Sequence, residues 1–216
     1  MKSKYWALIL MSCAYVGCLI AANTATGKTF DVFGASWTTA FIVFPIVYII
    51  NDVLCEVYGF KTARKVIFIA FACNLLAVLV YQIELAMPGS QFFSQQEAFE
   101  TVLGTTVRAT CASFAGYLIG STLNAWIMQK MHDRHGEKHL MARCVTSTLF
   151  GELADAAVFN IGFFLGVLPV ATIMTTIVTY GLAKVVYEIV AYPITRKVIH
   201  AVRNLPESAE VDPVTA

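Results

Sequence analysis

The sequence predicts an all-α, polytopic membrane protein with six transmembrane helices. Hydrophobic residues make up 58% of its 216 residues and charged residues only 13%, about half the charged share of a typical soluble domain. The apolar residues fall into six runs, each near the roughly 20 residues that an α-helix needs to cross the hydrocarbon core. Lysine and arginine collect at alternate ends of these runs. Together these observations favour a helical bundle that spans a bilayer.

Short polar or glycine-containing connections separate the runs. We expect helices over residues 5–26, 36–58, 65–87, 105–129, 144–167 and 171–199. The first run follows Lys2 and Lys4 and is longer than the apolar part of a signal peptide, so we assign it as a membrane helix. Residues 1–203 then form a single six-span domain. The polar residues 204–216 are expected to form a disordered cytoplasmic tail.

The basic residues predict the orientation. Twelve of the fifteen lysines and arginines lie before the first run or beside the inner ends of the later ones. The positive-inside rule places these segments, and with them both termini, in the cytoplasm. Residues 88–104 form the one long outer connection and include Phe92, Phe93 and Phe99. We expect an interfacial amphipathic turn there rather than a segment that re-enters the membrane.

Several functions have no support in the sequence. A formal net charge of +1 gives no basic surface for nucleic acid. No phosphate-binding loop, nucleophile elbow or zinc-protease motif is present, so we predict neither an enzyme nor a cofactor. The six cysteines contain no CxxC pair and are expected to be free. His132, His135 and His139 have a spacing seen in metal sites, but Gly136 interrupts the helix, and we prefer a solvated loop to a zinc site.

The strongest functional signal is a pair of carboxylates in the second run. Asp52 and Glu56 are four residues apart, so they lie on one face of a helix, next to Asn51. A carboxylate at membrane depth costs about 2.5 to 3.5 kcal/mol even on lenient insertion scales, and such residues are rare without a function. We therefore predict that Asp52 binds a ligand or a proton. Glu56 is closer to the basic connection and either shares that role or anchors an inner gate.

Other runs contribute polar residues within or beside the expected spans. They are Asn23 in the first run with Lys28 beyond it, Arg108, Tyr117 and Asn124 in the fourth, Glu152 and Asp155 in the fifth, and Lys184 and Glu188 in the sixth. Five carboxylates (Asp52, Glu56, Glu152, Asp155 and Glu188) compare with two cations at depth, Lys184 and Arg108. If these seven share one cavity, roughly three carboxylates are uncompensated and must be protonated, solvated or matched by donors on a ligand. Such a cavity favours an aminopurine-like or amidine-like solute, or a cation, over an anion.

Two of these features also have structural interpretations. Lys184 and Glu188 are four residues apart and can form an ion pair within one helix. Ala112, Gly116 and Gly120 recur at every fourth position, a pattern more typical of close helix packing than of a ligand site.

The arrangement of these residues resembles a known family. The run FPIVYIINDVLCEVYGFKTARKVI, which begins at Phe44, is similar, together with Asn23 and Lys28, to the queuosine precursor transporter family, also called the vitamin uptake transporter family. The segments STLFGELADAAVFN (147–160) and AKVVYEIVAYPITRKV (183–198) resemble its fifth and sixth spans. The segment from Phe99 to Tyr117, with Arg108 and Ser113, resembles its outer loop and fourth span. The resemblance covers about residues 5–200.

The resemblance implies a six-span inner-membrane transporter that imports 7-cyano-7-deazaguanine or 7-aminomethyl-7-deazaguanine for the salvage of queuosine in tRNA. A deazaguanine edge presents a ring N–H and an exocyclic NH₂ side by side, which match the two oxygens of one carboxylate. We expect Asp52, Glu56 or Asp155 to bind this edge, and Tyr48, Tyr117 or Trp37 to stack on the ring. The expected substrate-binding residues are Asn23, Lys28, Asn51, Asp52, Glu56, Arg108, Tyr117, Asn124, Glu152, Asp155, Lys184 and Glu188.

Alternatives stay open at this point. The chain can be a substrate-binding subunit that needs a separate ATP-driven module, or an importer of a related solute such as queuine. An intramembrane enzyme or a structural membrane protein is a further alternative. For a secondary transporter, the uncompensated negative charge suggests proton coupling through Glu56 or Glu188. The small-residue stripes are also compatible with a homodimer.

Overall fold

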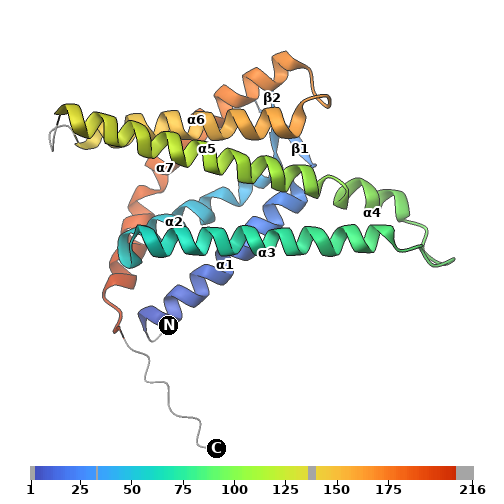
Figure 1. The fold of residues 1–216 in the computed structure, drawn as a ribbon, viewed down its shortest axis with the longest axis horizontal. Coiled ribbons are helices and arrows are strands. Elements are labelled where there is room, and N and C mark those ends of the chain that lie inside the picture. The colour runs from blue at the N-terminus through green and yellow to red at the C-terminus, as the bar shows by residue number, and fades with distance from the viewer. Residues whose placement is uncertain (1–2, 33, 136–139, 208–216) are drawn as a thin grey trace, which may run out of the picture.

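The computed structural model describes residues 3–32, 34–135 and 140–207. Seven α-helices account for most of them: α1 (Lys4–Ala25), α2 (Phe44–Tyr58), α3 (Phe60–Ala86), α4 (Gln96–Leu103), α5 (Thr106–His135), α6 (Leu140–Phe164) and α7 (Val170–Arg203). Strands β1 (Thr29–Val32) and β2 (Ala35–Thr38) form an antiparallel hairpin, followed by the 3₁₀ turn η1 (Thr39–Ile42). The long helices α3, α5 and α6 run side by side, with α1, α2 and α7 crossing at an angle (Figure 1).

The expected helix over 36–58 is wrong in its first part. Residues 35–38 belong to the hairpin instead, and α2 has only 15 residues, about 22 Å of helix. Gly34 at the hairpin turn has φ +79°, a conformation that favours glycine. The flanking strands are rich in β-branched and aromatic residues, which suit a pleated sheet. An apolar run long enough for one span therefore splits into a hairpin and a short helix.

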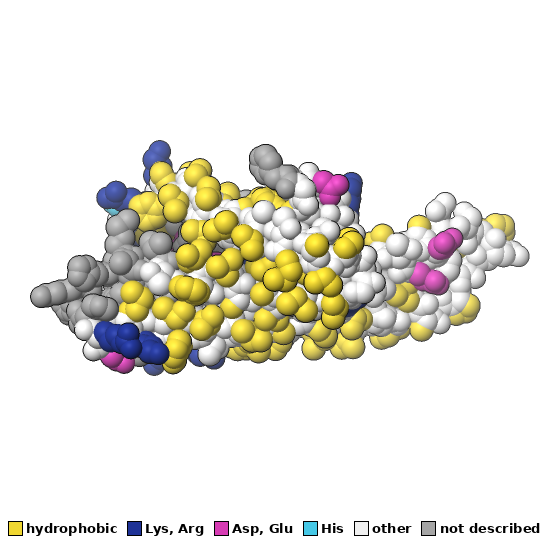
Figure 2. Space-filling model, turned by 90° about the horizontal axis from the view of Figure 1, so that it is seen from above, with side chains coloured by type: hydrophobic (Ala, Val, Ile, Leu, Met, Phe, Trp, Pro, Cys, Tyr) yellow, Lys and Arg dark blue, Asp and Glu magenta, His cyan; other side chains and the backbone are white. Residues whose placement is uncertain are grey.

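The helical membrane character predicted from composition is confirmed, whereas the number of spans is not. Within the described residues, four segments are long and apolar enough to cross a membrane: α1, α3, the stretch Gln96–Asn124 across α4 and α5, and α7. Figure 2 shows hydrophobic side chains spread over the middle of one face, with most lysine and arginine side chains near one end. Such a band is typical of a surface that faces lipid.

The connection 88–104 contains the short helix α4. Phe92 before it is 88% exposed, and Phe93 packs against Phe99 of α4 with ring centroids 6.1 Å apart. The interfacial turn stays a prediction.

The stripe Ala112, Gly116 and Gly120 is a packing surface, as predicted. A Cβ added to Gly116 would lie 2.7 Å from Asp155 Oδ1, and one added to Gly120 would lie 2.7 Å from the carbonyl oxygen of Gly151. On α6, Gly151 is equally close to α5, because a Cβ there would lie 2.8 Å from Cβ of Asn124. The absence of side chains at these positions lets the two helix backbones approach closely.

Apolar packing and buried polar contacts join the helices of the bundle. Ala7, Tyr15, Leu54, Phe71 and neighbouring residues of α1, α2 and α3 form one core cluster, and Ala112, Phe163 and Ile177 belong to a second between α5, α6 and α7. Asn74 of α3 donates a 2.7 Å hydrogen bond to Thr110 of α5, and both side chains are buried. Amide–hydroxyl contacts of this kind hold membrane helices together.

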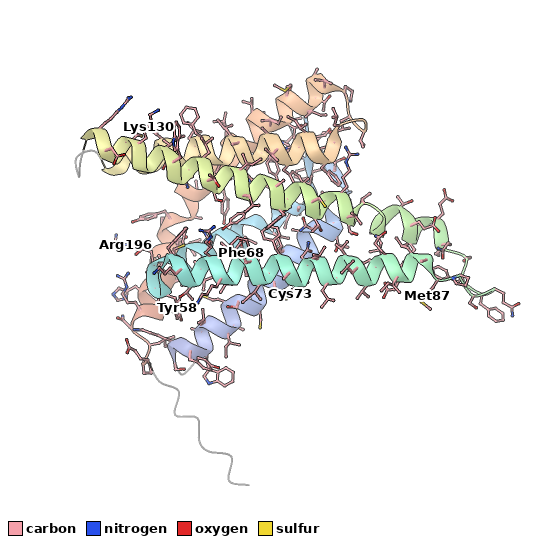
Figure 3. The ribbon with its side chains drawn as sticks, viewed as in Figure 1. Tyr58, Phe68, Cys73, Met87, Lys130 and Arg196 are labelled. Atoms are coloured by element: carbon pink, nitrogen blue, oxygen red, sulfur yellow. The ribbon has the colours of Figure 1, made fainter. Side chains whose placement is uncertain are left out.

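Both ends of the described chain lie at the same end of the bundle. The Lys4 amide donates to the carbonyl oxygen of Pro206 at 2.8 Å, and the Tyr58 hydroxyl donates to the Lys4 carbonyl at 2.6 Å. Lys130 and Arg196 lie toward this end as well, whereas Met87 lies toward the other (Figure 3). We call the end of the bundle at which both chain ends lie the terminal end. The opposite end, at which the β1–β2 hairpin lies, is the hairpin end. Residues 208–216 lie outside the described residues, so the tail stays a prediction.

Candidate functional site

An ion cluster between α6 and α7 forms the centre of the candidate site. The Lys184 ammonium on α7 lies 3.0 Å from Glu152 Oε2 and donates a hydrogen bond to Asp155 Oδ2, both on α6. Only 4% of the Lys184 side chain is exposed, against 24% and 25% for the two carboxylates. Glu152 and Asp155 are three residues apart and therefore share a helix face. We call Lys184, Glu152 and Asp155 the ion cluster.

The ion cluster gives Lys184 partners on a second helix, beyond the pairing that helical spacing suggested. The expected partner within α7 was Glu188, whose side chain lies outside the described residues. The pair within α7 therefore stays a prediction, and the described ion pairs of Lys184 reach across to α6. Two of the predicted carboxylates and the predicted lysine are thus brought together from segments 29 residues or more apart in sequence.

Close packing of α5 on α6 positions the carboxylates. Asp155 lies directly against Gly116, so the glycine leaves room for the carboxylate between the two helices. Asn124 of α5 packs on Gly151, the residue before Glu152. Tyr117 follows Gly116 in the sequence and packs on Phe71 of α3, with ring centroids 5.7 Å apart. The predicted residues Tyr117 and Asn124 therefore lie on the helix that borders the ion cluster.

An aromatic wall borders the ion cluster toward the hairpin end. The Lys184 ammonium lies 5.6 Å from the ring centroid of Tyr180, one turn earlier on α7. Tyr180 is 2% exposed, because Trp37 of β2 and Phe41 of η1 pack on it at centroid distances of 5.7 and 5.4 Å. Trp37 and Phe41 also contact each other at 4.7 Å. We call Trp37, Phe41 and Tyr180 the aromatic wall.

Sequence reasoning named Trp37 and missed its two neighbours. A signal for Tyr180 was present, because Thr176, Tyr180 and Lys184 recur at every fourth residue and so share one face of α7. Phe41 had no such signal, since it was placed in the interior of an expected helix. Tyr48 also was a stacking candidate, but its side chain lies outside the described residues.

Two predicted amides are buried with unpaired polar atoms. Asn23 of α1 is 4% exposed, and its Nδ2 donor has no hydrogen-bond partner within the described structure. Asn51 of α2 is partly buried, and its Oδ1 acceptor is likewise unpaired there. A buried polar atom left unpaired costs about 1 to 3 kcal/mol. Both amides therefore have hydrogen-bonding capacity available for a ligand.

Asp52 and Glu56 have different surroundings although they are one turn apart. Glu56 is 63% exposed at the terminal end and forms a 3.3 Å ion pair with Arg203 of α7. Asp52 is partly buried, and no ion pair or hydrogen bond of its side chain occurs within the described part of the chain. Asp52 is thus the more interior carboxylate, whereas Glu56 joins α2 to α7.

Arg108 and Lys28 lie away from the ion cluster. Arg108 Nε donates to the carbonyl oxygen of Gly162 at 2.8 Å, and a second guanidinium nitrogen donates to that of Leu165. These carbonyls end α6, so Arg108 caps this helix. Lys28 is exposed at the base of the hairpin. The described charges therefore do not form one connected network: Glu56 pairs with Arg203, and Arg108 binds backbone carbonyls, apart from the ion cluster.

The predicted absence of a metal site stays a prediction. His132, His135 and His139 lie outside the part whose side chains the structure describes. Within the described residues, no group of three or more histidine, cysteine or acidic side chains is arranged to hold a metal ion.

The fold and the site define a class of protein. A bundle of long apolar helices that keeps ion pairs and unpaired amides in its interior is typical of membrane transporters for small molecules. The chain belongs to the family of putative vitamin uptake transporters, whose family model matches residues 38–198. The family predicted from the sequence motifs is thereby confirmed.

Relatives of known name lead to the same family. A "Probable queuosine precursor transporter" of Bacillus subtilis (strain 168) is 27% identical over 176 residues, which cover 81% of this chain and 76% of the relative. A protein of the same name from Haemophilus influenzae is 27% identical over 143 residues, 65% of this chain and 57% of the relative. The "Queuosine precursor transporter" of Escherichia coli (strain K12) is 24% identical over 156 residues, 72% and 68% of the two chains. No solved structure matches the chain.

Proposed function

We propose that this chain imports the queuosine precursors 7-cyano-7-deazaguanine and/or 7-aminomethyl-7-deazaguanine across the inner membrane as a secondary transporter. The names of the three relatives support this class of solute. The observation that carries the assignment of the binding site is the ion cluster, in which the nearly buried Lys184 joins two partly exposed carboxylates between α6 and α7.

The ion cluster offers the hydrogen-bonding groups that a guanine-like edge requires. A carboxylate accepts two parallel N–H bonds from the ring N–H and the exocyclic NH₂, and an ammonium donates to the ring carbonyl. Glu152 and Asp155 retain about a quarter of their exposure, so they are the accessible members of the cluster. Two carboxylates and one ammonium have one net negative charge, which favours N–H donors or a cationic aminomethyl group over an anion.

The aromatic wall supplies a stacking surface for the ring. The Tyr180 side chain lies one turn, about 6 Å along the axis, from Lys184 on the same face of α7. A planar bicycle bound at the carboxylates therefore lies within reach of Tyr180, against which rings pack edge-on or offset. Asn23, Asn51 and Asp52 have polar atoms without described partners and are the proposed contacts for the remaining edges of the solute.

We further propose six membrane crossings, with the terminal end in the cytoplasm. In this arrangement α2 with the hairpin, and α6, supply the two crossings beyond the four apolar segments. The lysines and arginines near the inner ends of the helices support the orientation. A fused reporter that is active only in the cytoplasm should be active at the C-terminus and inactive when inserted after Pro88.

Uptake measurements test the solute class and the mechanism together. Cells that cannot make queuosine precursors should accumulate labelled 7-deazaguanines only when they express this chain, and unlabelled precursor should compete more strongly than guanine or queuine. Preferential competition by queuine would favour the alternative solute. Purified chain in proteoliposomes should import without a partner protein, whereas a binding subunit of an ATP-driven transporter would not. Loss of uptake after addition of an uncoupler would support proton coupling over facilitated diffusion.

Substitutions test the site. We expect Asp155→Asn and Glu152→Gln each to lower uptake at least tenfold, because an amide accepts only one of the two N–H bonds that a carboxylate accepts. Glu97→Gln on α4 is the matched control, since this exposed carboxylate lies outside the ion cluster. Wild-type uptake in both cluster variants would refute the assignment of the site while leaving the solute class intact.

A further inference from the structure

The β1–β2 hairpin lies over the aromatic wall and is fastened to α7 by side-chain hydrogen bonds. The Ser36 amide donates to Thr176 Oγ1 at 3.2 Å, and the Thr176 hydroxyl lies 3.3 Å from the Ser36 carbonyl oxygen. One turn along α7, the Trp37 indole N–H donates to Thr179 Oγ1 at 3.2 Å. These contacts involve neutral groups, which bind more weakly than the ion cluster beneath them.

The aromatic side chains form a continuous path from the surface to the ion cluster. Phe30 of β1 is 37% exposed and contacts Trp37, with ring centroids 6.3 Å apart. Trp37 covers Tyr180, and Tyr180 borders Lys184. Lys184 lies fourteen residues into α7, about 21 Å from its start at the hairpin end. A solute that approaches from the hairpin end along this path meets Trp37 before it meets the ion cluster.

Hydrogen bonds within the hairpin hold its two strands together. Its strands pair over four residues each, from Thr29 with Thr38 to Val32 with Ala35. At the base, the Thr39 amide donates to the Lys28 carbonyl oxygen at 2.9 Å and closes the loop. This internal pairing keeps the hairpin intact when its hydrogen bonds to α7 break. The side chains of β1 are largely exposed, whereas Ala35 and Thr38 of β2 are buried, so the hairpin rests on the bundle through β2.

We propose that the hairpin is the gate at this end of the transporter and that Trp37 is its plug. In the closed state, which the structure represents, Trp37 packs on Tyr180, the residue that borders Lys184. Opening breaks the contacts of Ser36 and Trp37 with α7 and exposes the ring of Tyr180. An arriving planar solute then replaces Trp37 as the ring that packs on Tyr180. This inference rests on the proposed function for the position of the binding site.

A reversible cross-link tests the gate by its effect on uptake. Ser36→Cys with Thr176→Cys, in a chain freed of its other cysteines, places two thiols where the hairpin meets α7. Oxidation should lower precursor uptake at least tenfold, and reduction should restore it. The two single variants are the matched controls and should not respond. Full uptake by the oxidised double variant, with the disulfide verified by mass spectrometry, would overturn the proposal.

A labelling experiment tests the gate without any transported solute. Glu152→Cys, in the same cysteine-free chain, leaves Lys184 paired with Asp155 and should react slowly with a membrane-impermeant thiol reagent added from the hairpin side. Adding Trp37→Ala should raise the labelling rate at least fivefold, and adding Phe93→Ala should not, because Phe93 is an aromatic residue of the 88–104 connection outside the wall. Equal rates in the three chains would refute the gate.

The two experiments distinguish a failure of the gate from a failure of the proposed function. If the wild-type chain imports no deazaguanine, the proposed function is wrong, and the labelling rates alone decide on the gate. If the chain imports deazaguanine but neither the cross-link nor Trp37→Ala changes uptake or labelling, the gate is wrong and the proposed function stands. Trp37→Phe provides a second variant if Trp37→Ala fails to fold: loss of the hydrogen bond to Thr179 should then raise the labelling rate.

Discussion

The Lys184 ammonium on α7 donates a hydrogen bond to the Asp155 carboxylate on α6. The other oxygen of the same carboxylate lies against Gly116 of α5, where an added Cβ would come within 2.7 Å. One side chain therefore connects three helices. Substitutions around it should affect the charge balance and the helix packing separately, which makes the two contributions measurable.

Removal of the ammonium should destabilise the protein. Lys184→Met leaves Glu152 and Asp155 side by side between helices without their shared cation. Breaking a buried ion pair costs about 3 to 5 kcal/mol, and partial exposure of the carboxylates reduces this toward the lower figure. We expect a clear fall of the apparent melting temperature in detergent and loss of uptake. Addition of Glu152→Gln to Lys184→Met should recover part of the stability, whereas addition of Glu97→Gln should not.

A methyl group between α5 and α6 should disrupt their packing. Gly116→Ala places a Cβ 2.7 Å from Asp155 Oδ1 and 3.0 Å from its carbonyl oxygen, so α5 must move away from α6. Overpacking of this kind costs about 1 to 3 kcal/mol. The matched control is Gly17→Ala on α1, where nothing lies within 4 Å of the added Cβ. A lower melting temperature for Gly17→Ala than for Gly116→Ala would contradict the packing.

Neutralisation of Asp52 and neutralisation of Glu56 should have different effects on uptake. We expect Asp52→Asn to lower uptake sharply with little effect on stability, since this carboxylate is partly buried without a described ion pair or hydrogen bond. Glu56→Gln removes an exposed pair with Arg203, worth about 0 to 1 kcal/mol. Initial uptake rates over a range of precursor concentrations measure the difference. Equal losses in the two variants would mean that Glu56 also contributes to the binding site or to the gate at the terminal end.

Arg108 should act through α6 rather than through the solute. Arg108→Gln removes donors from the carbonyls of Gly162 and Leu165, so we expect faster amide hydrogen exchange in the last turn of α6 and an unchanged KM for uptake. Lys28→Gln, at an exposed residue of the same end, should change neither quantity. A KM raised severalfold in Arg108→Gln, with unchanged exchange, would return Arg108 to the binding site.

Within a single helix, the sequence is sufficient to group residues by face. The four-residue spacing of Ala112, Gly116 and Gly120 predicts one packing surface, and the structure confirms it against α6. The membrane class and the family also follow from the chain alone, because apolar runs and local motifs need no knowledge of the fold. The same reasoning overestimated the helix over 36–58, since apolarity does not distinguish a buried hairpin strand from a helix.

The partners of the charged residues were decided only by the tertiary structure. Lys184 binds two residues of α6, and Glu56 binds Arg203, 147 positions away. Helical periodicity fixes which residues share a face, but the packing of helices decides what each face meets. The amino-acid sequence by itself determined that this protein is a membrane transporter of its family with carboxylates at depth. The three-dimensional packing decided that one lysine joins two of those carboxylates beneath an aromatic hairpin, because contacts between distant segments depend on how the helices assemble.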